Sequence, residues 1–275
     1  MTGKLYLVAT PIGNLGDLSP RAAEVLAAVD FIAAEDTRVS VRLLNHLGIK
    51  KPMISYFQHN LRQRGQEIAA RIEAGESCAI ITDAGMPCIS DPGEDLVALC
   101  AERGIEVVGV PGANAAITAL ALSGLPTARF CFEGFLSVNK RSRRQHLQEL
   151  AGERRTMIFY EAPHKLQATL NDLLSTLGDR RVSLAREITK LHEEVRRTTL
   201  AQAAEYYSQN PPRGEFVLVV EGAPAPRQPR IPIEQAVQQV VDLQKEGLAA
   251  SEAARQVAHA TGYKKSELYR LAGLE

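Results

Sequence analysis

The sequence predicts two consecutive α/β domains followed by a small all-helical segment. Short apolar runs alternate with amphipathic runs along most of the chain. The apolar runs are continuous rather than interrupted by polar residues, which is typical of parallel strands that helices cover on both faces. With 275 residues, of which 45% are hydrophobic and 23% charged, the chain is long enough for two globular domains of ordinary size.

The first domain is expected at residues 1–124, with a mostly parallel sheet. Its first helix has a recognisable start, because Ser19 can serve as N-cap and Pro20 follows at the first helical position. Parallel strands separated by such helices are characteristic of an α/β fold. The expected strands are Leu5–Ala9, Phe31–Ala34, Met53–Tyr56, Ala79–Thr82 and Glu106–Gly109.

The second domain is expected at residues 125–222, after a junction near Gly124. It repeats the alternation of apolar and amphipathic runs and is therefore a second α/β unit. Its expected strands are Phe130–Glu133, Thr156–Tyr160, Val182–Ala185 and Phe216–Val220. Its expected helices are Arg141–Leu150, His164–Leu177 and Thr199–Ser208.

A proline-rich stretch separates these domains from the end of the chain. Residues 223–232 are interpreted as a linker, and residues 233–275 as a helical segment. A turn at Gly262 between two helical patterns is similar to a helix-turn-helix. However, residues 232–275 carry five basic and six acidic side chains, a poor balance for binding nucleic acid phosphates. We therefore expect a helical cap or a dimer contact there.

Bulk properties exclude several classes of protein. The apolar run before Pro11 is too short for a signal peptide, and no run approaches the roughly 20 residues of a membrane helix, so a cytoplasmic protein without a membrane partner is expected. The four cysteines show no CxxC pairing, so we expect reduced thiols and no metal site. A net charge of zero does not by itself call for nucleic acid, and no DNA partner is expected.

The loop after the strand at 79–82, DAGMPCISDPG, has an unusual set of turn residues. Loops at the carboxyl ends of parallel strands are where such sheets bind ligands. Two prolines in this loop have no N–H group, and Asp83 and Asp91 would repel an anion, so a phosphate ligand is disfavoured. S-adenosylmethionine, which carries a sulfonium, an ammonium and no phosphate, fits. Asp91 is expected to cap the following helix, which makes Asp83 the better binding candidate.

Eight segments together closely resemble the ribosomal RNA small-subunit methyltransferase I family, a branch of the tetrapyrrole methylase superfamily. The resemblance extends from Lys4 to Gly222 in the family's order. It implies two α/β domains of the tetrapyrrole-methylase type with S-adenosylmethionine in the cleft between them, and a homodimer. It also implies methylation of a ribose 2′-hydroxyl on a cytidine in the decoding region of small-subunit rRNA. The segments are LYLVATPIGNLGDLSPRA, AAEDTR, TDAGMPCISDPG, VPGANAAITALALSGL, FEGFL, YEAPHK, REITKLHEE and GEFVLVVEG.

The resemblance also assigns site residues. Those implied for the cofactor are Pro11, Ile12, Gly13, Asp83, Ala84, Gly85, Met86, Ile89, Asn114, Ala115, Tyr160, Glu161, Ala185, Arg186, Gly214, Glu215 and Phe216. Asn114 departs from the hydroxyl residue that this superfamily often has there. Glu187 and Lys190 become candidates for catalysis. If REITKLHEE were helical, Lys190, Glu193 and Glu194 would share a face, and a surface ion-pair cluster is the alternative interpretation.

RNA contacts are expected from two places. Asp36, Arg38, His59 and Asn60 follow the second and third strands and so lie on the rim of the presumed site. Lys140, Arg141, Arg143 and Arg144 follow FEGFL directly, and basic residues are the usual contacts of RNA phosphates.

Two other functions remain open. A methylase of a porphyrin-like precursor would explain the cofactor loops but neither YEAPHK, REITKLHEE nor the arginine cluster. A ligand-binding regulator with a DNA-reading helical tail is disfavoured by the charge balance of that tail.

Overall fold

The computed structural model describes residues 3–224 and 231–273. The chain divides between Ala223 and Pro224 into two compact units. Most of the expected linker at 223–232 lies outside the described residues. Every strand expected from the sequence is present among the described residues, with ends within two residues of the expected ones.

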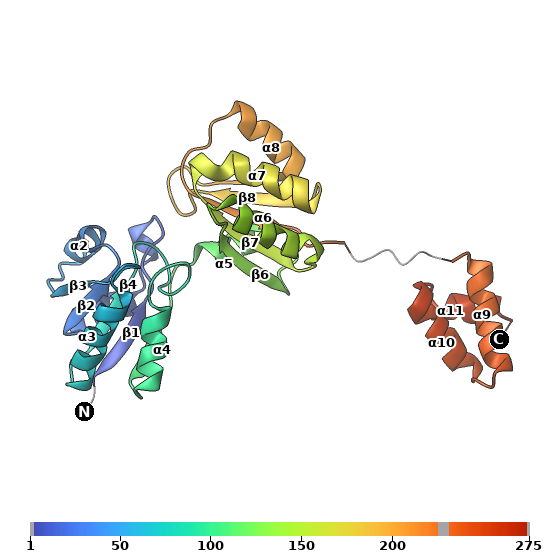
Figure 1. Ribbon diagram of the computed structural model, residues 1–275, viewed down its shortest axis with the longest axis horizontal. Coiled ribbons are helices and arrows are strands. Elements are labelled where there is room, and N and C mark those ends of the chain that lie inside the picture. Colours follow the sequence, from blue (N-terminus) through green and yellow to red (C-terminus); the bar gives the residue numbers. More distant parts are fainter. Residues whose placement is uncertain (1–2, 225–230, 274–275) are drawn as a thin grey trace. The chain divides into compact units, whose positions relative to one another are not determined.

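The first sheet has five parallel strands in the order β3-β2-β4-β1-β5 (Figure 1). The prediction of a parallel sheet in the first half is thus confirmed. The strands are β1 (Lys4–Val8), β2 (Phe31–Ala34), β3 (Met53–Ser55), β4 (Cys78–Ile81) and β5 (Glu106–Val110). The helices are α1 (Pro20–Ala28), α2 (Thr37–His46), α3 (Leu61–Glu73) and α4 (Glu94–Glu102), with a 3-10 turn at Leu15–Asp17.

Successive residues of the central strands enter cores on opposite faces of the sheet. In β4, Cys78 and Ile80 pack with α3 and α4, whereas Ala79 and Ile81 pack with α1 and α2. All four of these residues are buried. Both faces are therefore covered, which explains why the strand is apolar at every position. Ser19 caps α1 as expected, accepting a hydrogen bond from the Ala22 N–H at 3.1 Å.

The second sheet is mixed, with the order β6-β7-β10-β8-β9. Only β6 and β7 pair in parallel, and the remaining neighbours are antiparallel. The strands are β6 (Phe130–Phe135), β7 (Thr156–Glu161), β8 (Arg181–Arg186), β9 (Glu194–Thr199) and β10 (Phe216–Val220). The helices are α6 (Lys140–Glu149), α7 (Pro163–Leu177) and α8 (Leu200–Gln209), with a 3-10 turn at Leu150–Gly152.

Strand β9 corrects the helix considered for REITKLHEE. Residues 187–193 form a loop in which Glu187 and Thr189 have positive φ, and Glu194 already begins β9. Lys190 and Glu194 therefore share no helix face. The strand has no continuous apolar run (EVRRTT): its residues are partly buried or exposed, and Arg196 lies over the Tyr206 ring.

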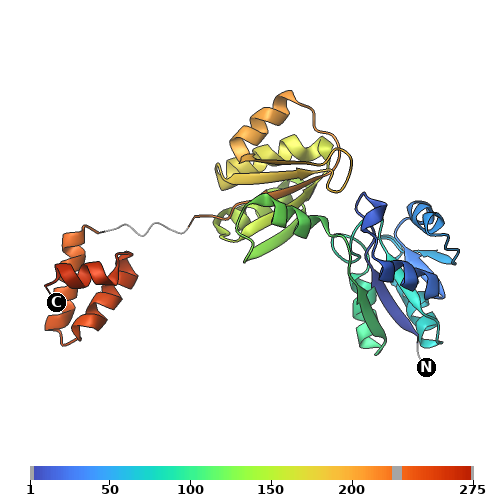
Figure 2. The ribbon, with the colours of Figure 1, turned by 180° about the vertical axis from the view of Figure 1, so that it is seen from behind.

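Helix α5 (Ala115–Ser123) follows the last strand of the first sheet but packs on the second sheet. Ala116, Ala119 and Leu120 contact residues of β7, β8 and β10, on the face opposite to the one that α6, α7 and α8 cover. In Figures 1 and 2, α5 accordingly lies beside the β6–β10 sheet. The division of this unit at residue 124 remains a prediction.

Residues 224–275 contain α9 (Ile233–Lys245), α10 (Ala250–Thr261) and α11 (Lys265–Leu271). These helices bury a small core of their own that includes Ala236, Val240 and Leu268. Gly262 ends α10 at φ 75°, as the expected turn requires. Within the part of the chain that is described, no helix is long and apolar enough to cross a membrane.

Candidate active site

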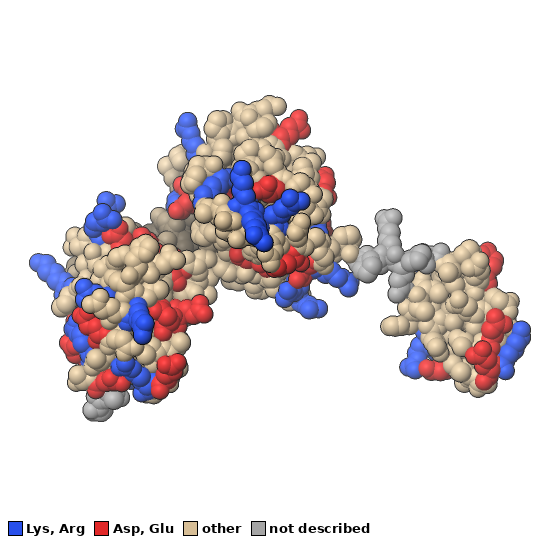
Figure 3. Space-filling model, in the orientation of Figure 1, with Lys and Arg blue, Asp and Glu red and all other residues tan. Residues whose placement is uncertain are grey.

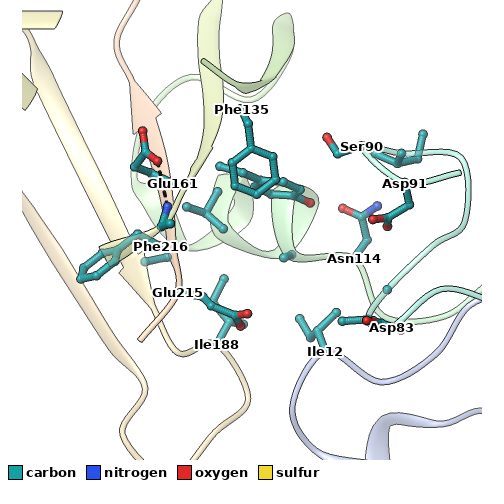
Figure 4. Close-up of a pocket in the computed structure, with 18 of the residues that line it drawn as sticks. Ile12, Asp83, Ser90, Asp91, Asn114, Phe135, Glu161, Ile188, Glu215 and Phe216 are labelled. Atoms are coloured by element: carbon teal, nitrogen blue, oxygen red, sulfur yellow. Dashed lines mark hydrogen bonds between the residues drawn. The ribbon is translucent and has the colours of Figure 1, made fainter. Parts of the chain in front are cut away.

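A cavity of about 510 Å³ lies among the loops that follow β1, β4 and β5 and the ends of β7, β8 and β10. In Figure 4, Ile12, Asp83, Asp91 and Asn114 approach it from one side, and Glu161, Ile188, Glu215 and Phe216 from the other. The first-sheet loops thus face the second sheet across this cavity. Its volume falls within the range usual for small-molecule sites.

The loop after β1 and the loop after β4 are tied together. Thr10 and Gly85 exchange two backbone hydrogen bonds of 2.8 and 3.1 Å, and the Thr10 hydroxyl donates to the Thr82 carbonyl at 3.1 Å. Gly85, Cys88 and Ser90 all have positive φ, of 86°, 72° and 65°. Positive φ at the two non-glycine residues is strained backbone, which typically occurs at binding sites.

Three carboxylates gather at this wall of the cavity: Glu35, Asp83 and Asp91. Burial, and then the neighbouring Glu35, raise the pKa of Asp91 to about 6, and the same two causes raise the pKa of Asp83. Glu35 is held by the Thr82 hydroxyl at 2.7 Å, and Asp83 Oδ1 accepts from the Asp36 N–H at 3.3 Å. Such a cluster favours a cationic ligand, which would relieve the mutual repulsion.

The expected capping role of Asp91 is wrong. Helix α4 begins at Glu94, its N-cap is Gly93 at φ 135°, and no side chain caps it. A Cβ on Gly93 would come within 2.7 Å of Cys88 Sγ, so only glycine fits at this position. Asp91 is thereby left to face the cavity (Figure 4).

Asn114 and Tyr160 form the part of the wall next to α5. Asn114 is the N-cap of α5 and accepts from the Ile117 N–H at 3.0 Å, which gives its side chain a structural task besides lining the cavity. The Tyr160 hydroxyl accepts from the Ala116 N–H at 3.2 Å. Both contacts fix the amino end of α5 to the cavity.

Glu161 is buried, and each of its carboxylate oxygens accepts a hydrogen bond from within the protein. It accepts hydrogen bonds from the Ala162 N–H at 2.8 Å and from the Thr169 hydroxyl. Thr169 in turn accepts from the Arg143 guanidinium at 2.9 Å. Glu161 therefore fixes the start of α7 at the edge of the cavity.

Lys190 is held by two carboxylates. Its Nζ donates to Glu187 Oε1 at 3.0 Å and to Glu215 Oε2 at 2.7 Å. Burial alone would lower the pKa of Lys190, but Glu215 and Glu187 outweigh it and raise that pKa, so the amine is protonated at neutral pH. For Glu187, burial is outweighed by the Glu215 N–H and Lys190, which lower its pKa. The site thus presents a fixed ammonium rather than a basic amine.

Two glycines make room for this group. A Cβ on Gly13 would come within 2.5 Å of Lys190 Cγ, and a Cβ on Gly214 would come within 2.5 Å of the Glu187 side chain. Gly214 also has φ 79°, which disfavours any other residue. Neither glycine lines the cavity, yet both control the position of a residue that does.

Most of the cofactor candidates line the cavity, namely Ile12, Asp83, Ala84, Gly85, Met86, Ile89, Asn114, Ala115, Tyr160, Glu161, Ala185, Glu215 and Phe216. The catalytic candidates Glu187 and Lys190 line it as well. Four candidates do not, namely Pro11, Gly13, Arg186 and Gly214. Arg186 instead pairs with Glu194 at 3.2 Å.

Several lining residues were not among the cofactor or catalytic candidates. They are Glu35, Ser90, Asp91, Phe135, Ala162, Pro163, His164, Ile188 and Val217. Glu35 lies in the segment AAEDTR and Asp91 in TDAGMPCISDPG, and their carboxylates could have marked them as binding candidates. Phe135 lies in the segment FEGFL, just after the expected strand Phe130–Glu133, and nothing in the sequence distinguished its ring from those of Phe130 and Phe132.

The RNA candidates of the first domain lie outside the cavity lining and have local partners. Asp36 caps α2 and pairs with Arg38 at 2.6 Å, and that hydrogen-bonded pair lowers the pKa of Asp36 to about 2. Asn60 accepts from the Phe57 N–H at 2.9 Å and donates to the Ser55 carbonyl at 3.0 Å. His59 packs edge-on against Phe57 with 6.0 Å between ring centroids.

The basic residues of α6 divide between two faces. Lys140, Arg141 and Arg144 line a groove together with Gln145 and Gln148, whereas Arg143 points inward to Asp172 at 2.5 Å and to Thr169. Among the described residues, no carboxylate lies within 4.0 Å of the charged atoms of the three groove cations. Figure 3 shows Lys and Arg side chains gathered on the face over this helix.

Cys88 is not activated. Burial raises its pKa to about 11, with Asp95 adding to the effect, so its thiol stays protonated at neutral pH. None of the four cysteines is in a disulfide. The described residues contain no group of three or more His, Cys, Asp or Glu side chains placed to hold a metal ion.

Comparison with known proteins identifies the family. The model of the family Tetrapyrrole (Corrin/Porphyrin) Methylases matches residues 4–204. The ribosomal RNA small subunit methyltransferase I of Synechocystis sp. is 52% identical over 270 residues, 98% of this chain and 97% of that protein. The protein of the same name from Thermotoga maritima is 47% identical over 220 residues, 80% of this chain and 99% of its own length.

The fold is similar to that of a solved methyltransferase structure. The structure of uroporphyrin-III-C-methyltransferase from Thermus thermophilus superposes with a TM-score of 0.56 at 19% identity, over 79% of this chain and 94% of that one. The likeness to this structure is thus one of fold. Together with the family model and the curated relatives, this shows that the chain belongs to the tetrapyrrole methylases and, among them, to the ribosomal RNA small subunit methyltransferase I family.

Proposed function

We propose that this protein transfers a methyl group from S-adenosylmethionine to the ribose 2′-hydroxyl of a cytidine in the decoding region of small-subunit rRNA. The family to which the chain belongs supports the reaction class. The observation that carries the assignment to this site is a cavity with a carboxylate cluster on one wall and a protonated lysine on another.

The cavity suits S-adenosylmethionine chemically. Asp83, Asp91 and Glu35 offer negative charge to a ligand that bears a sulfonium and an ammonium. Apolar side chains such as Ile12, Met86 and Ile188 provide surface for its uncharged parts. The four cofactor candidates outside the lining, Pro11, Gly13, Arg186 and Gly214, are proposed to act by shaping the neighbouring loops.

The bound cofactor supplies an electrophilic methyl group, and the protein must present the acceptor oxygen in line with it. We assign Lys190 to the developing negative charge on that oxygen, because its ammonium is already fixed by Glu187 and Glu215. Glu187 acts here as the anchor of Lys190. Its lowered pKa makes it a weak base, which favours positioning over proton abstraction.

The substrate is proposed to approach over α6. Lys140, Arg141 and Arg144 line a groove and have no ion-pair partner among the described residues, which suits the phosphates of RNA. Arg143 braces the helix and is not proposed to contact RNA. Asp36, Arg38, His59 and Asn60 remain proposed rim contacts.

Other parts of the proposal concern the setting of the enzyme. We include a homodimer, a cytoplasmic location, and no role for DNA or a membrane. The resemblance in sequence supports the dimer. The two α/β domains at 1–124 and 125–222, the linker and the helical segment at 233–275 are kept as the proposed division of the chain.

One assay tests the function. The protein is incubated with methyl-labelled S-adenosylmethionine in three parallel reactions. One contains small ribosomal subunits from cells lacking the enzyme, one contains the free RNA, and one contains a tetrapyrrole precursor. Label in the RNA supports the proposal. Label in the tetrapyrrole would identify a precursor methylase instead, and label in none of them would contradict an enzymatic role of this kind.

A further inference from the structure

Phe135 is an exposed aromatic side chain at the cavity. It lines the cavity and is 58% exposed, more than Ile89 at 40%, the other large apolar lining residue with a high exposure. Figure 4 shows its ring projecting into the cavity between the Glu161 side and the Asn114 side. A phenylalanine ring left this exposed forgoes much of the stabilisation that burial would give, so its position calls for an explanation.

A β-bulge sets the direction of this ring. The pairing of β6 with β7 shifts between Phe132 and Gly134, where Gly134 has φ 61°. Phe132 and Phe135 are three residues apart and would point to opposite faces of a regular strand. Because of the extra residue they pair with Ile158 and Tyr160 and lie on the same face. Bulges of this kind commonly re-aim a side chain next to an active site.

The Phe135 ring packs against Tyr160. Tyr160 packs edge-on against Phe135 with 5.5 Å between centroids, and against Phe132 with 5.0 Å. Tyr160 is itself fixed by the Ala116 N–H at 3.2 Å. One edge of the Phe135 ring is thus supported, while a large part of its surface stays accessible.

Phe135 is also close along the chain to the basic groove. Strand β6 is the edge strand of its sheet, and the chain runs from Phe135 to Lys140, the first residue of α6, in five residues. These residues can span at most about 18 Å. Asn139 caps α6, and four cations crowd its first turns against the helix dipole, an arrangement that costs stability and suits an anionic ligand.

We propose that Phe135 is the stacking platform for the base of the nucleotide that is methylated. This inference rests on the proposed function. An RNA segment whose phosphates lie in the Lys140–Arg144 groove would turn its target base onto the Phe135 ring and its ribose toward Lys190. Sequence-tolerant stacking on aromatic side chains is the usual way in which proteins hold unstacked RNA bases.

The adenine of the cofactor is the competing flat ligand. The edge-strand position and the direct connection to the cationic groove favour the RNA base, because a cofactor without phosphate has no use for that groove. Loss of the ring would raise KM for the subunit if the ring stacks on the RNA base, and would raise the Kd for the cofactor if it stacks on adenine. Measuring both constants therefore separates the two ligands.

The test uses the full chain with small subunits as substrate and four variants. Phe135→Ala is expected to raise KM for the subunit roughly 5- to 150-fold, the range known for loss of one stacked base, with the Kd for S-adenosylmethionine unchanged. Phe135→Tyr should retain near-native KM, whereas Phe135→Leu, apolar but not flat, should resemble Phe135→Ala. Phe130→Ala, which removes an aromatic ring 38% exposed on the same strand and outside the cavity lining, is the matched control.

The outcomes are distinct. If Phe135→Ala instead weakens cofactor binding and leaves the KM for the subunit unchanged, the ring belongs to the adenine and the inference is wrong. Unchanged KM and Kd, or full recovery by Phe135→Leu, would also overturn it. Failure of the wild-type protein to methylate small subunits would count against the proposed function itself and is visible before any variant is compared.

Discussion

Lys190 occupies the space left by the missing side chain of Gly13, since a Cβ there would come within 2.5 Å of Lys190 Cγ. Gly13 belongs to the loop after β1, and Lys190 to the loop after β8. The ammonium that we assign to the reaction is therefore positioned by contacts from both sheets.

Gly13→Ala should displace Lys190 without unfolding the protein, because the atoms in the way belong to a flexible side chain. We expect kcat on small subunits to fall by roughly 100-fold, the effect of about 1 Å of misplacement, with little change in Tm. Gly109→Ala, at a glycine whose Cβ would meet nothing within 4 Å, is the control. Native kcat in Gly13→Ala would show that the position of Lys190 is not critical.

Asp83→Ala is expected to abolish measurable S-adenosylmethionine binding in calorimetry. The carboxylate faces the cavity at the tip of β4, and among the described residues it accepts one hydrogen bond, a long one of 3.3 Å from the Asp36 N–H. The fold should therefore tolerate the loss, and thermal unfolding provides the check. Near-native affinity in a folded variant would mean that Asp83 serves the loop rather than the cofactor.

Cofactor affinity should depend on pH through Asp91, whose pKa is raised to about 6 by burial and then by Glu35. A cationic ligand binds the ionised form, so affinity should fall by up to roughly tenfold from pH 7 to pH 5. Calorimetry on Asp91→Asn should give a flatter profile. Asp83, whose pKa is also raised, accounts for any remaining slope, and an unchanged slope would contradict the assignment.

The same shift has the opposite sign for stability. Because the folded-state pKa of Asp91 lies above its ordinary value, the folded protein binds more protons than the unfolded chain between about pH 4 and 6. This contribution to the free energy of unfolding is present at low pH and lost as pH rises through 6. Asp91→Asn should therefore be at least as stable as wild type at pH 7.

Replacing Arg141 and Arg144 together by alanine should weaken binding to small subunits while leaving cofactor affinity intact. Both side chains lie in the groove without an ion-pair partner in the described chain. Loss of two phosphate contacts should reduce the slope of log K against log salt by roughly 1.4. Unchanged binding at moderate salt would place the RNA elsewhere.

Arg143→Ala is the matched contrast on the same helix. Its side chain is 12% exposed and its guanidinium donates to Asp172 and Thr169, so its loss should cost roughly 2 kcal/mol of stability and lower Tm by several degrees. The salt dependence of RNA binding should stay as in wild type. A reduced salt slope in this variant would restore Arg143 to the RNA contacts.

The sequence predicted the strands well because burial on both faces leaves a direct signal. Every residue of β2 and β4 is buried, and each run is apolar throughout. Strand β9 gave no such signal, since its residues are at most partly buried and Val195 is its one apolar residue. The packing of α5 on the second sheet was equally hidden, because an apolar helix does not record which sheet it covers.

Features of the site that depend on residue type could be predicted from the sequence, whereas features that depend on backbone geometry could not. The carboxylate at Asp83 and the acidic character of its loop follow from the sequence. The role of Asp91 does not, because it depends on Gly93 taking over the start of α4. The direction of Phe135 depends on one extra residue in β6, which alternation alone cannot show.

The central claim is tested most directly by the position of the methyl group. Small subunits lacking the modification are incubated with the protein and labelled cofactor, and the rRNA is then hydrolysed in alkali. A 2′-O-methyl group blocks cleavage at its own nucleotide, so the account predicts label in an alkali-resistant dinucleotide that begins with cytidine. Label released as an ordinary mononucleotide would place the methyl group on a base and contradict the account.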